Sequence, residues 1–258
     1  MNRPLVIGNW KMNLDYVEAV HLVQQIGVVL RNKPLEHVDL VVVPPFVDIR
    51  SVTSVVESER VSITVGAQHA SVHEAGAHTG EVSVPMLQRL GVSWILVGHS
   101  ERRAMYAMTD EVVAQTLRTV TRFGLTAVLC VGEELSVRES GDQDDFVTAQ
   151  LHAALGGLDE ASRGLVTIAY EPVWAIGTGL TASTGQVREM TEHIRTVAAS
   201  LSLDGVRVLY GGSVNAENAA ALMSEGRVDG FLVGGASLKA ESFLAIGQAA
   251  NDCYDGKR

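Results

Sequence analysis

The sequence has few cysteines, few aromatic residues and no long apolar run. Its two cysteines, Cys130 and Cys253, exclude a disulfide framework and suit a reducing compartment. No segment approaches the roughly 18 consecutive apolar residues that a membrane helix requires. The first residues, MNRPLVIGNWKMN, contain no small-residue cleavage site of the signal-peptide type. We therefore expect a protein of a reducing compartment that does not interact with membranes.

Basic residues are also scarce. The 20 Lys and Arg residues are outnumbered by 30 Asp and Glu residues, which gives a formal net charge of −10. This charge argues against a nucleic-acid partner, because nucleic acids are bound by basic surfaces. It also means that a site for an anionic ligand must be made positive locally, by a Lys, an Arg or backbone N–H groups.

Apolar residues make up 47% of the 258 residues and aromatic residues only 5%, so Val, Leu, Ile and Ala must fill the core. Eight short runs are almost continuously apolar, which is typical of parallel strands that are covered on both faces. These runs are Leu5–Ile7, Val38–Val43, Val61–Val65, Trp94–Val97, Thr126–Val131, Val166–Ala169, Val206–Leu209 and Gly230–Val233.

Segments with helical spacing separate most of these runs, and Asp15, Thr184 and Asn215 are typical helix starts. One predicted apolar stripe comprises Val17, Val20, Val23, Val28 and Leu30. The third interval differs, because residues 67–84 are rich in Gly, His, Ser and Thr and read as a long loop. The pattern predicts a (β/α)8 barrel of the α/β class, with eight parallel strands inside a ring of helices, as one domain over residues 1–258. A doubly wound open sheet is the alternative.

Functional residues of such barrels lie on the loops that follow the strands. Lys11, His99 and Glu171 follow the first, fourth and sixth runs, so we expect them at one end of the barrel. A carboxylate at the end of a buried strand is partly desolvated, which suits a general base, and a histidine is a second group that can exchange protons. Lys11 supplies a positive charge, and Glu101 either positions Lys11 or pairs with Arg102. The ordinary alternatives are a capping carboxylate, a structural histidine and a solvated lysine.

Glycine pairs end the last two runs. Gly211 and Gly212 precede Ser213, and Gly234 and Gly235 follow the eighth run. Backbone N–H groups that no Cβ shields, next to helix starts, form a cradle for anions. A phosphate site after strands seven and eight is common in barrels of this kind.

Two further patterns are weaker. Residues 177–182, GTGLTA, match a dinucleotide-binding pattern, but Glu171 to Ile176 separate them from the preceding strand, so the geometry of that motif is not met. His69, His73 and His78, with Glu74 and Glu81, resemble a metal-ligand set. The glycines among them favour a loop, and we expect no metal and no cofactor.

Taken together, the motifs make the chain resemble the triosephosphate isomerase family from end to end. They are GNWKMN (8–13), GAQ (66–68), TGEVS (79–83), VGHSERR (97–103), CVGE (130–133), AYEPVWAIGTG (169–179), YGGSV (210–214) and GFLVGGASL (230–238). Their order and spacing match the family over nearly the whole chain.

The resemblance implies that the chain interconverts D-glyceraldehyde 3-phosphate and dihydroxyacetone phosphate through an enediol or enediolate. It implies that Glu171 carries the proton, that a neutral His99 polarises the carbonyl, and that Lys11, with Asn9 beside it, faces the oxyanion. The phosphate-binding residues that it implies are Gly177, Ser213, Gly234 and Gly235. Two alternatives are open: an isomerase of another short sugar phosphate, such as a four-carbon ketose phosphate, and a non-catalytic barrel that binds a ligand.

The resemblance also implies a cytoplasmic homodimer in which the loop His69–Val84 reaches the partner, with Thr79 near the neighbouring site. The departures from the family fall on this loop and on an expected buried charge network. His69 stands where the family often has Asn or Asp, His78 where it often has an aromatic residue, and Ala107 and Met108 where it commonly has Gly and Glu. These departures bear on dimer affinity and stability, and the three histidines predict an association that depends on pH between about 5 and 7.

Overall fold

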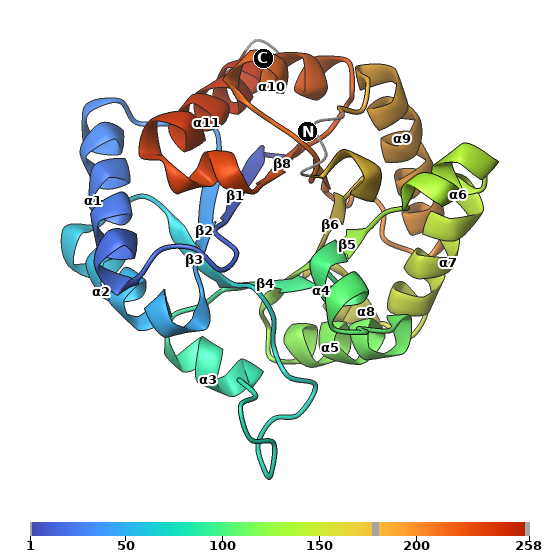
Figure 1. Ribbon diagram of the computed structural model, residues 1–258, viewed down its shortest axis with the longest axis horizontal. Coiled ribbons are helices and arrows are strands. Elements are labelled where there is room, and N and C mark those ends of the chain that lie inside the picture. The colour runs from blue at the N-terminus through green and yellow to red at the C-terminus, as the bar shows by residue number, and fades with distance from the viewer. Residues whose placement is uncertain (1, 177–180, 256–258) are drawn as a thin grey trace.

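The computed structural model describes residues 2–176 and 181–255. The strands form a closed barrel in the order β1 to β8, and every neighbouring pair is parallel (Figure 1). Their bounds are β1 Leu5–Asn9, β2 Asp39–Val43, β3 Thr64–Ala67, β4 Trp94–Val97, β5 Thr126–Val131, β6 Val166–Tyr170, β7 Val208–Tyr210 and β8 Gly230–Val233.

The helices surround the barrel in Figure 1. The α-helices are α1 Tyr16–Asn32, α2 Ile49–Glu59, α3 Val84–Arg89, α4 Ser100–Met105, α5 Asp110–Arg122, α6 Leu135–Ser140, α7 Gln143–Leu155, α8 Glu160–Arg163, α9 Thr184–Ser200, α10 Ala216–Ser224 and α11 Ala240–Asp255. Within the described ranges, short 3-10 helices also follow strands: η1 Phe46–Asp48, η2 Val173–Ala175 and η3 Gly235–Leu238.

The pairing of the first and last strands decides between the two predicted architectures. Leu5 of β1 lies opposite Gly230 of β8, so the sheet closes on itself. The (β/α)8 barrel is confirmed and the open sheet is wrong. The segment between β3 and α3 is a long loop, as expected, and it projects beyond the ring of helices (Figure 1).

Two apolar layers explain why the strands are apolar almost throughout. Alternate residues of a strand point to opposite faces. One set, which includes Leu5, Ile7, Leu96 and Leu209, forms a cluster inside the barrel. The other set, which includes Val6 and Ile95, packs with the helices in a larger outer cluster. A strand that is buried on both faces has no polar face to show in its sequence.

Local capping explains where the helices begin. Asp15 and Asn215 cap α1 and α10 in capping boxes, as predicted. The prediction for α9 was one residue late, because Ser183 is the cap and Thr184 is the first helical residue. The buried side of α1 also differs from the predicted stripe. It comprises Ala19, Leu22, Val23, Ile26, Gly27 and Leu30, whereas Val17 and Val28 are 41% and 51% exposed.

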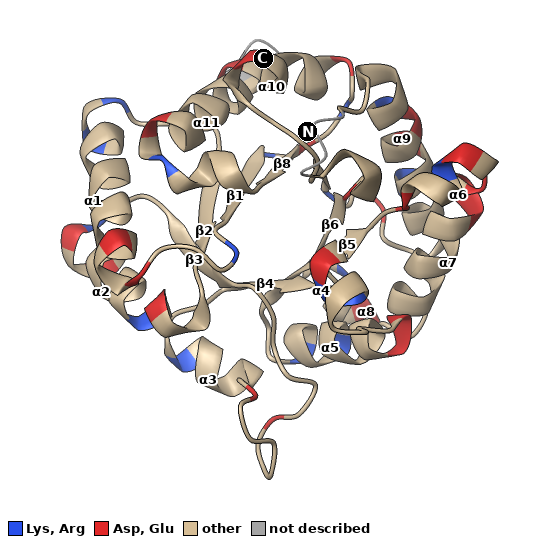
Figure 2. Ribbon diagram, in the orientation of Figure 1, with Lys and Arg blue, Asp and Glu red and all other residues tan. Residues whose placement is uncertain are grey.

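Charged residues are distributed over the outer helices, where segments with Asp and Glu alternate with segments with Lys and Arg (Figure 2). Across the described residues, the helices are too short or too polar to cross a membrane.

Ala107, in the turn between α4 and α5, has a left-handed backbone with φ of 50°. A side chain in this region costs about 1–2 kcal/mol, and glycine adopts it without that cost. We expect Ala107→Gly to raise the free energy of unfolding by about 1 kcal/mol, since the extra freedom of glycine in the unfolded chain offsets part of the gain. Urea denaturation would measure it.

Ala220→Gly is the matched control, because Ala220 is exposed in the middle of α10. It is expected to lower the free energy of unfolding by about 1 kcal/mol, since glycine is a poor helix former. Equal destabilisation by both changes would contradict the strain assigned to Ala107.

Candidate active site

A cavity of about 340 Å³ opens at the carboxyl ends of the strands. The residues on its wall include Asn9 and Lys11 after β1, His99 after β4, Glu171 after β6, Ser213 after β7, and Gly234 and Gly235 after β8. Residues from five strand ends therefore meet around one cavity. The described residues among the predicted set lie together, and Glu101, on α4, reaches the same place through Lys11.

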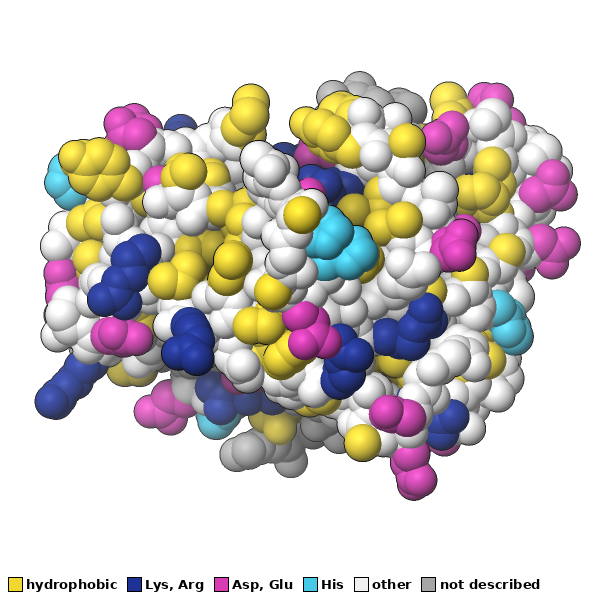
Figure 3. Space-filling view, turned by 90° about the horizontal axis from the view of Figure 1, so that it is seen from below, with side chains coloured by type: hydrophobic (Ala, Val, Ile, Leu, Met, Phe, Trp, Pro, Cys, Tyr) yellow, Lys and Arg dark blue, Asp and Glu magenta, His cyan; other side chains and the backbone are white. Residues whose placement is uncertain are grey.

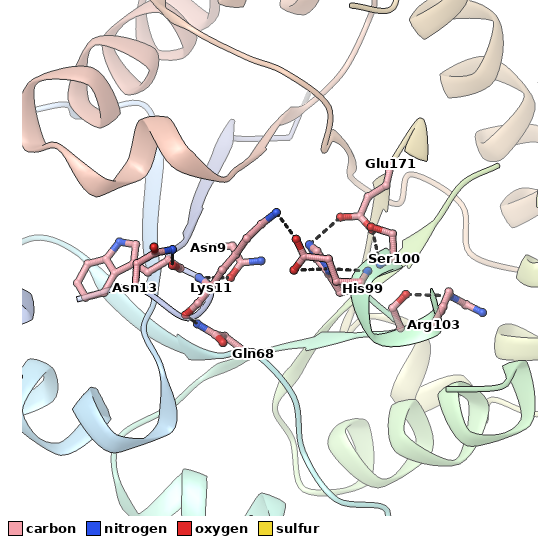
Figure 4. Close-up of polar contacts among 11 residues, drawn as sticks. Asn9, Lys11, Asn13, Gln68, His99, Ser100, Arg103 and Glu171 are labelled. Atoms are coloured by element: carbon pink, nitrogen blue, oxygen red, sulfur yellow. Dashed lines mark hydrogen bonds and ion pairs between the residues drawn. The ribbon is translucent and has the colours of Figure 1, made fainter. Parts of the chain in front are cut away.

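Lys11 is held in an uncommon backbone conformation, with φ of 53°. Its N–H donates to Asn9 Oδ1 at 3.0 Å, and its carbonyl accepts from Gln68 Nε2 at 2.7 Å. Its ammonium group lies 2.5 Å from Glu101 Oε1 (Figure 4). Strain of this kind persists where neighbouring groups enforce it. Asn9 and Gln68 thus fix the backbone of Lys11, and Glu101 directs its charge.

The sequence offers Glu101 two basic partners, Lys11 and Arg102. The described ion pairs include Glu101 with Lys11 and not with Arg102. The Arg102 guanidinium instead lies over the Tyr106 ring, 5.2 Å from its centroid. Gln68 was not among the predicted site residues, although the GAQ motif that contains it was noted.

His99 and Glu171 are in direct contact. His99 Nδ1 accepts a hydrogen bond from the Glu101 N–H at 3.2 Å, so the ring carries its proton on Nε2 when it is neutral. His99 Nε2 lies 3.1 Å from Glu171 Oε1, and the Ser100 N–H donates to Glu171 Oε2 at 2.9 Å (Figure 4). Both oxygens of a carboxylate that is only 2% exposed therefore have a polar neighbour, one through a hydrogen bond and one through a close contact with the imidazole. Ser100 was missed, since a backbone donor leaves no signal in a residue type.

Glycines allow the backbone to pack against Glu171. A Cβ at Gly211 would lie 2.9 Å from Glu171 Cγ. This distance is shorter than ordinary van der Waals contact, so the first glycine of the YGGS motif leaves room for the carboxylate. Gly234 lies beside Lys11, since a Cβ there would be 3.6 Å from Lys11 Cε. Gly211 and Gly234 thus shape the wall around the charged groups.

The predicted phosphate side of the cavity is formed by the loops after β7 and β8. Ser213 donates its hydroxyl to the carbonyl of Ala175 at 3.2 Å, which connects this side to η2. Asn218 donates to the carbonyl of Ser213 at 3.2 Å and so closes the turn. Gly177, the remaining predicted phosphate ligand, and the first part of the GTGLTA pattern lie outside the described residues.

A second buried carboxylate holds the segment after Glu171. Tyr170 OH and Trp174 Nε1 donate to Glu133 Oε1 at 3.0 and 2.8 Å. Burial and the adjacent Glu133 carboxylate raise the pKa of Tyr170 well above its usual range, so its hydroxyl stays a donor. Glu133 is fully buried and was missed as a structural partner, although the CVGE motif contains it.

Two histidines of the histidine-rich loop lie against each other. His73 and His78 stack with their ring centroids 3.7 Å apart and their planes 4° apart. In the described part of the chain, no group of three His, Cys, Asp or Glu side chains is arranged to hold a metal ion.

His69, the third histidine of the loop, has a shifted pKa. Burial, together with the nearby positive charge of Arg102, lowers the pKa of His69 to about 4. Its Nδ1 is buried, with no hydrogen-bond partner among the described residues. His69 therefore titrates below the range from pH 5 to 7 that we expected for the loop.

This low pKa predicts a pH-dependent stability. The folded state binds the proton of His69 more weakly than the unfolded state does, so stability falls as the pH drops from 6.5 toward 4. We expect His69→Asn to lose about 2 kcal/mol less stability than the parent between pH 7.5 and pH 5. Urea denaturation at one fixed protein concentration would measure it. His21→Asn, a change at an exposed histidine on α1, is the control, and identical pH dependence in all three proteins would contradict the prediction.

The fold and the cavity define an enzyme of the (β/α)8-barrel class. The family model described as triosephosphate isomerase matches residues 4–250. A triosephosphate isomerase of Nocardia farcinica is 48% identical over 252 residues, which cover 96% of this chain and 97% of that protein. Those of Corynebacterium efficiens and Mycobacterium bovis are each 47% identical and cover 96% of this chain, with 96% and 97% of their own length matched. This chain belongs to the triosephosphate isomerase family.

Proposed function

We propose that this chain interconverts D-glyceraldehyde 3-phosphate and dihydroxyacetone phosphate. One observation carries the proposal: a carboxylate, an imidazole and an ammonium group from three strand ends face one cavity with the glycine turns after β7 and β8. Phosphate binds at those turns, through the N–H groups of Ser213, Gly234 and Gly235 and, from outside the described residues, of Gly177.

The chemistry is a proton transfer between adjacent carbons. Glu171 removes the proton from the carbon beside the carbonyl, and the electron pair moves to the carbonyl oxygen. His99 Nε2–H donates to that oxygen, and Lys11 stabilises its negative charge. His99 gives its Nε2 proton to that oxygen and takes the proton of the neighbouring hydroxyl, so that this second oxygen can become the new carbonyl. Glu171 returns its proton to the former carbonyl carbon, and no proton is gained or lost overall, so that no cofactor is needed. Asn9 and Glu101 act by holding Lys11 in place.

A coupled assay with glyceraldehyde 3-phosphate tests the proposal. We expect turnover with the three-carbon phosphate and a much lower kcat/KM with a four-carbon ketose phosphate. Preference for the four-carbon substrate would favour a different isomerase. Binding of a phospho-hydroxamate no more tightly than inorganic phosphate would instead favour a non-catalytic barrel.

We further propose a cytoplasmic homodimer of one-domain subunits, with the loop His69–Val84 at the interface. Exposed apolar side chains in the segments that follow β1 to β4 support it: Met12, Tyr16, Val47, Met86, Met105 and Tyr106 are 55–94% exposed. Figure 3 shows apolar and histidine side chains on one face of the molecule. Exposed large apolar side chains that gather on one face are a common feature of protein interfaces. Sedimentation should give the mass of a dimer, and a monomer at micromolar concentration would contradict it.

A further inference from the structure

The end of β5 packs against the backbone of Glu171. The Glu171 N–H donates to the Val131 carbonyl at 2.8 Å, and the Val173 N–H donates to the Glu133 carbonyl at 3.0 Å. The pairing with the chain after β6 therefore continues past the end of β5. Between these two bonds, a Cβ at Gly132 would lie 1.8 Å from the Glu171 carbonyl oxygen. Any shift of Gly132 toward Glu171 is thus transmitted to the Glu171 backbone.

The backbone N–H and carbonyl of Gly132 face the other way, since alternate residues of a strand bond to opposite neighbours. On that side β4 ends at Val97, which lies opposite Leu129 and stops short of Gly132. Gln150 of α7 takes the place of the missing strand. Its Oε1 accepts from the Gly132 N–H at 2.9 Å, and its Nε2 donates to the Gly132 carbonyl at 3.4 Å.

We propose that Gln150 is a positioning residue for Glu171. The Gln150 side chain is 5% exposed, and both ends of its amide are used on one residue. Through these two bonds α7 fixes Gly132, and Gly132 fixes the backbone of Glu171. The inference rests on the proposed role of Glu171 as the base.

A cavity beside Gly132 and Glu171 leaves room for this part of the chain to shift if the hydrogen bonds of Gln150 are lost. A second cavity, of about 400 Å³, is lined by Gln150, Gly132 and Glu171 together. Tight packing would otherwise hold a buried side chain in place. Beside this cavity, the two hydrogen bonds of Gln150 hold Gly132 in place where packing does not.

The expected consequence is a loss of turnover without a loss of substrate binding. Proton transfer depends steeply on geometry, and a displacement of about 1 Å costs on the order of 10²-fold in rate. The phosphate turns lie after β7 and β8 and line the first cavity, whereas Gln150 lines the second. A positioning role therefore predicts a lower kcat with KM almost unchanged.

The test is Gln150→Met, which keeps the length of the side chain and removes both hydrogen bonds. We expect kcat to fall by about tenfold, an intermediate misplacement, with KM within about twofold of the parent. The kinetic isotope effect on kcat, with deuterium at the carbon that loses its proton, should rise. Thr148→Val is the matched control, because it removes a hydrogen bond between α7 and His193 of α9. It should leave kcat, KM and the isotope effect unchanged.

Active sites are counted by titration with a phospho-hydroxamate, so that unfolded protein does not lower the apparent kcat. A parental kcat and isotope effect in folded Gln150→Met would overturn the proposal. If that variant does not fold, Gln150→Glu serves instead, since it keeps the acceptor for the Gly132 N–H and, when ionised, lacks the donor. Parental kinetics in Gln150→Glu would overturn the proposal equally.

Glu171→Gln separates this proposal from the one on which it rests. If Glu171→Gln is nearly inactive and Gln150→Met is fully active, only the positioning role fails. If Glu171→Gln keeps its turnover, Glu171 is not the base and both proposals fail.

Discussion

Replacing Glu171 by Gln is expected to lower kcat by about 10²–10⁴-fold, the range over which a general base contributes. The amide has nearly the same shape as the carboxylate and can still accept a hydrogen bond from Ser100, so the site should stay assembled. What it loses is the ability to take a proton. KM should change little, because the phosphate turns are untouched. The coupled assay with glyceraldehyde 3-phosphate measures both values.

Two further variants make this result specific. Glu171→Asp keeps the carboxylate but shortens its reach by one methylene, so we expect a smaller loss than with Gln. Glu139→Gln removes a carboxylate at an exposed position of α6 and should leave kcat unchanged. A loss of less than about tenfold in Glu171→Gln would end its assignment as the base.

The second large effect is expected for Lys11→Met. We predict that kcat/KM falls by about 10²–10³-fold, as when one donor to a developing oxyanion is removed. KM should rise as well, since the substrate is an anion and the protein carries a formal net charge of −10. Loss of Lys11 also leaves the Glu101 carboxylate unpaired beside the cavity, which adds repulsion.

Lys239→Met is the matched control for this charge. It makes the same change in net charge at an exposed lysine after η3, outside the residues that line the cavity. If both lysine variants lose activity equally, the effect comes from the overall charge of the protein. If only Lys11→Met loses activity, the effect belongs to the site.

The fold was predictable because the apolar runs of parallel strands are short and regularly spaced. Closure was not, since the same runs suit an open sheet, and only the pairing of Leu5 with Gly230 separates the two. Details on the surface of helices were least certain. Val28 fits an apolar period but lies 51% exposed, because periodicity does not say which side of α1 meets the barrel.

The site was predictable where the chemistry resides in a residue type. Lys11, His99 and Glu171 can be found in the sequence because each follows an apolar run and has a side chain that carries a charge or exchanges a proton. The groups that hold them are harder to find. Ser100 acts through its N–H, and Gln68 and Gln150 act on backbone groups of distant residues. Contacts of this kind depend on tertiary structure and have no local pattern.

The Glu133 carboxylate, which accepts from both Tyr170 and Trp174, limits how often η2 moves away from β5. Its hydrogen bond from Trp174 ties η2, which carries the contact with Ser213, to the end of β5. A hydrogen bond to a charged group contributes about 1.5–3 kcal/mol. This hydrogen bond therefore lowers the fraction of molecules in which Trp174 is displaced by roughly 10- to 100-fold. A ligand makes the displaced arrangement the major one only if it binds that arrangement more tightly than the other by at least this factor.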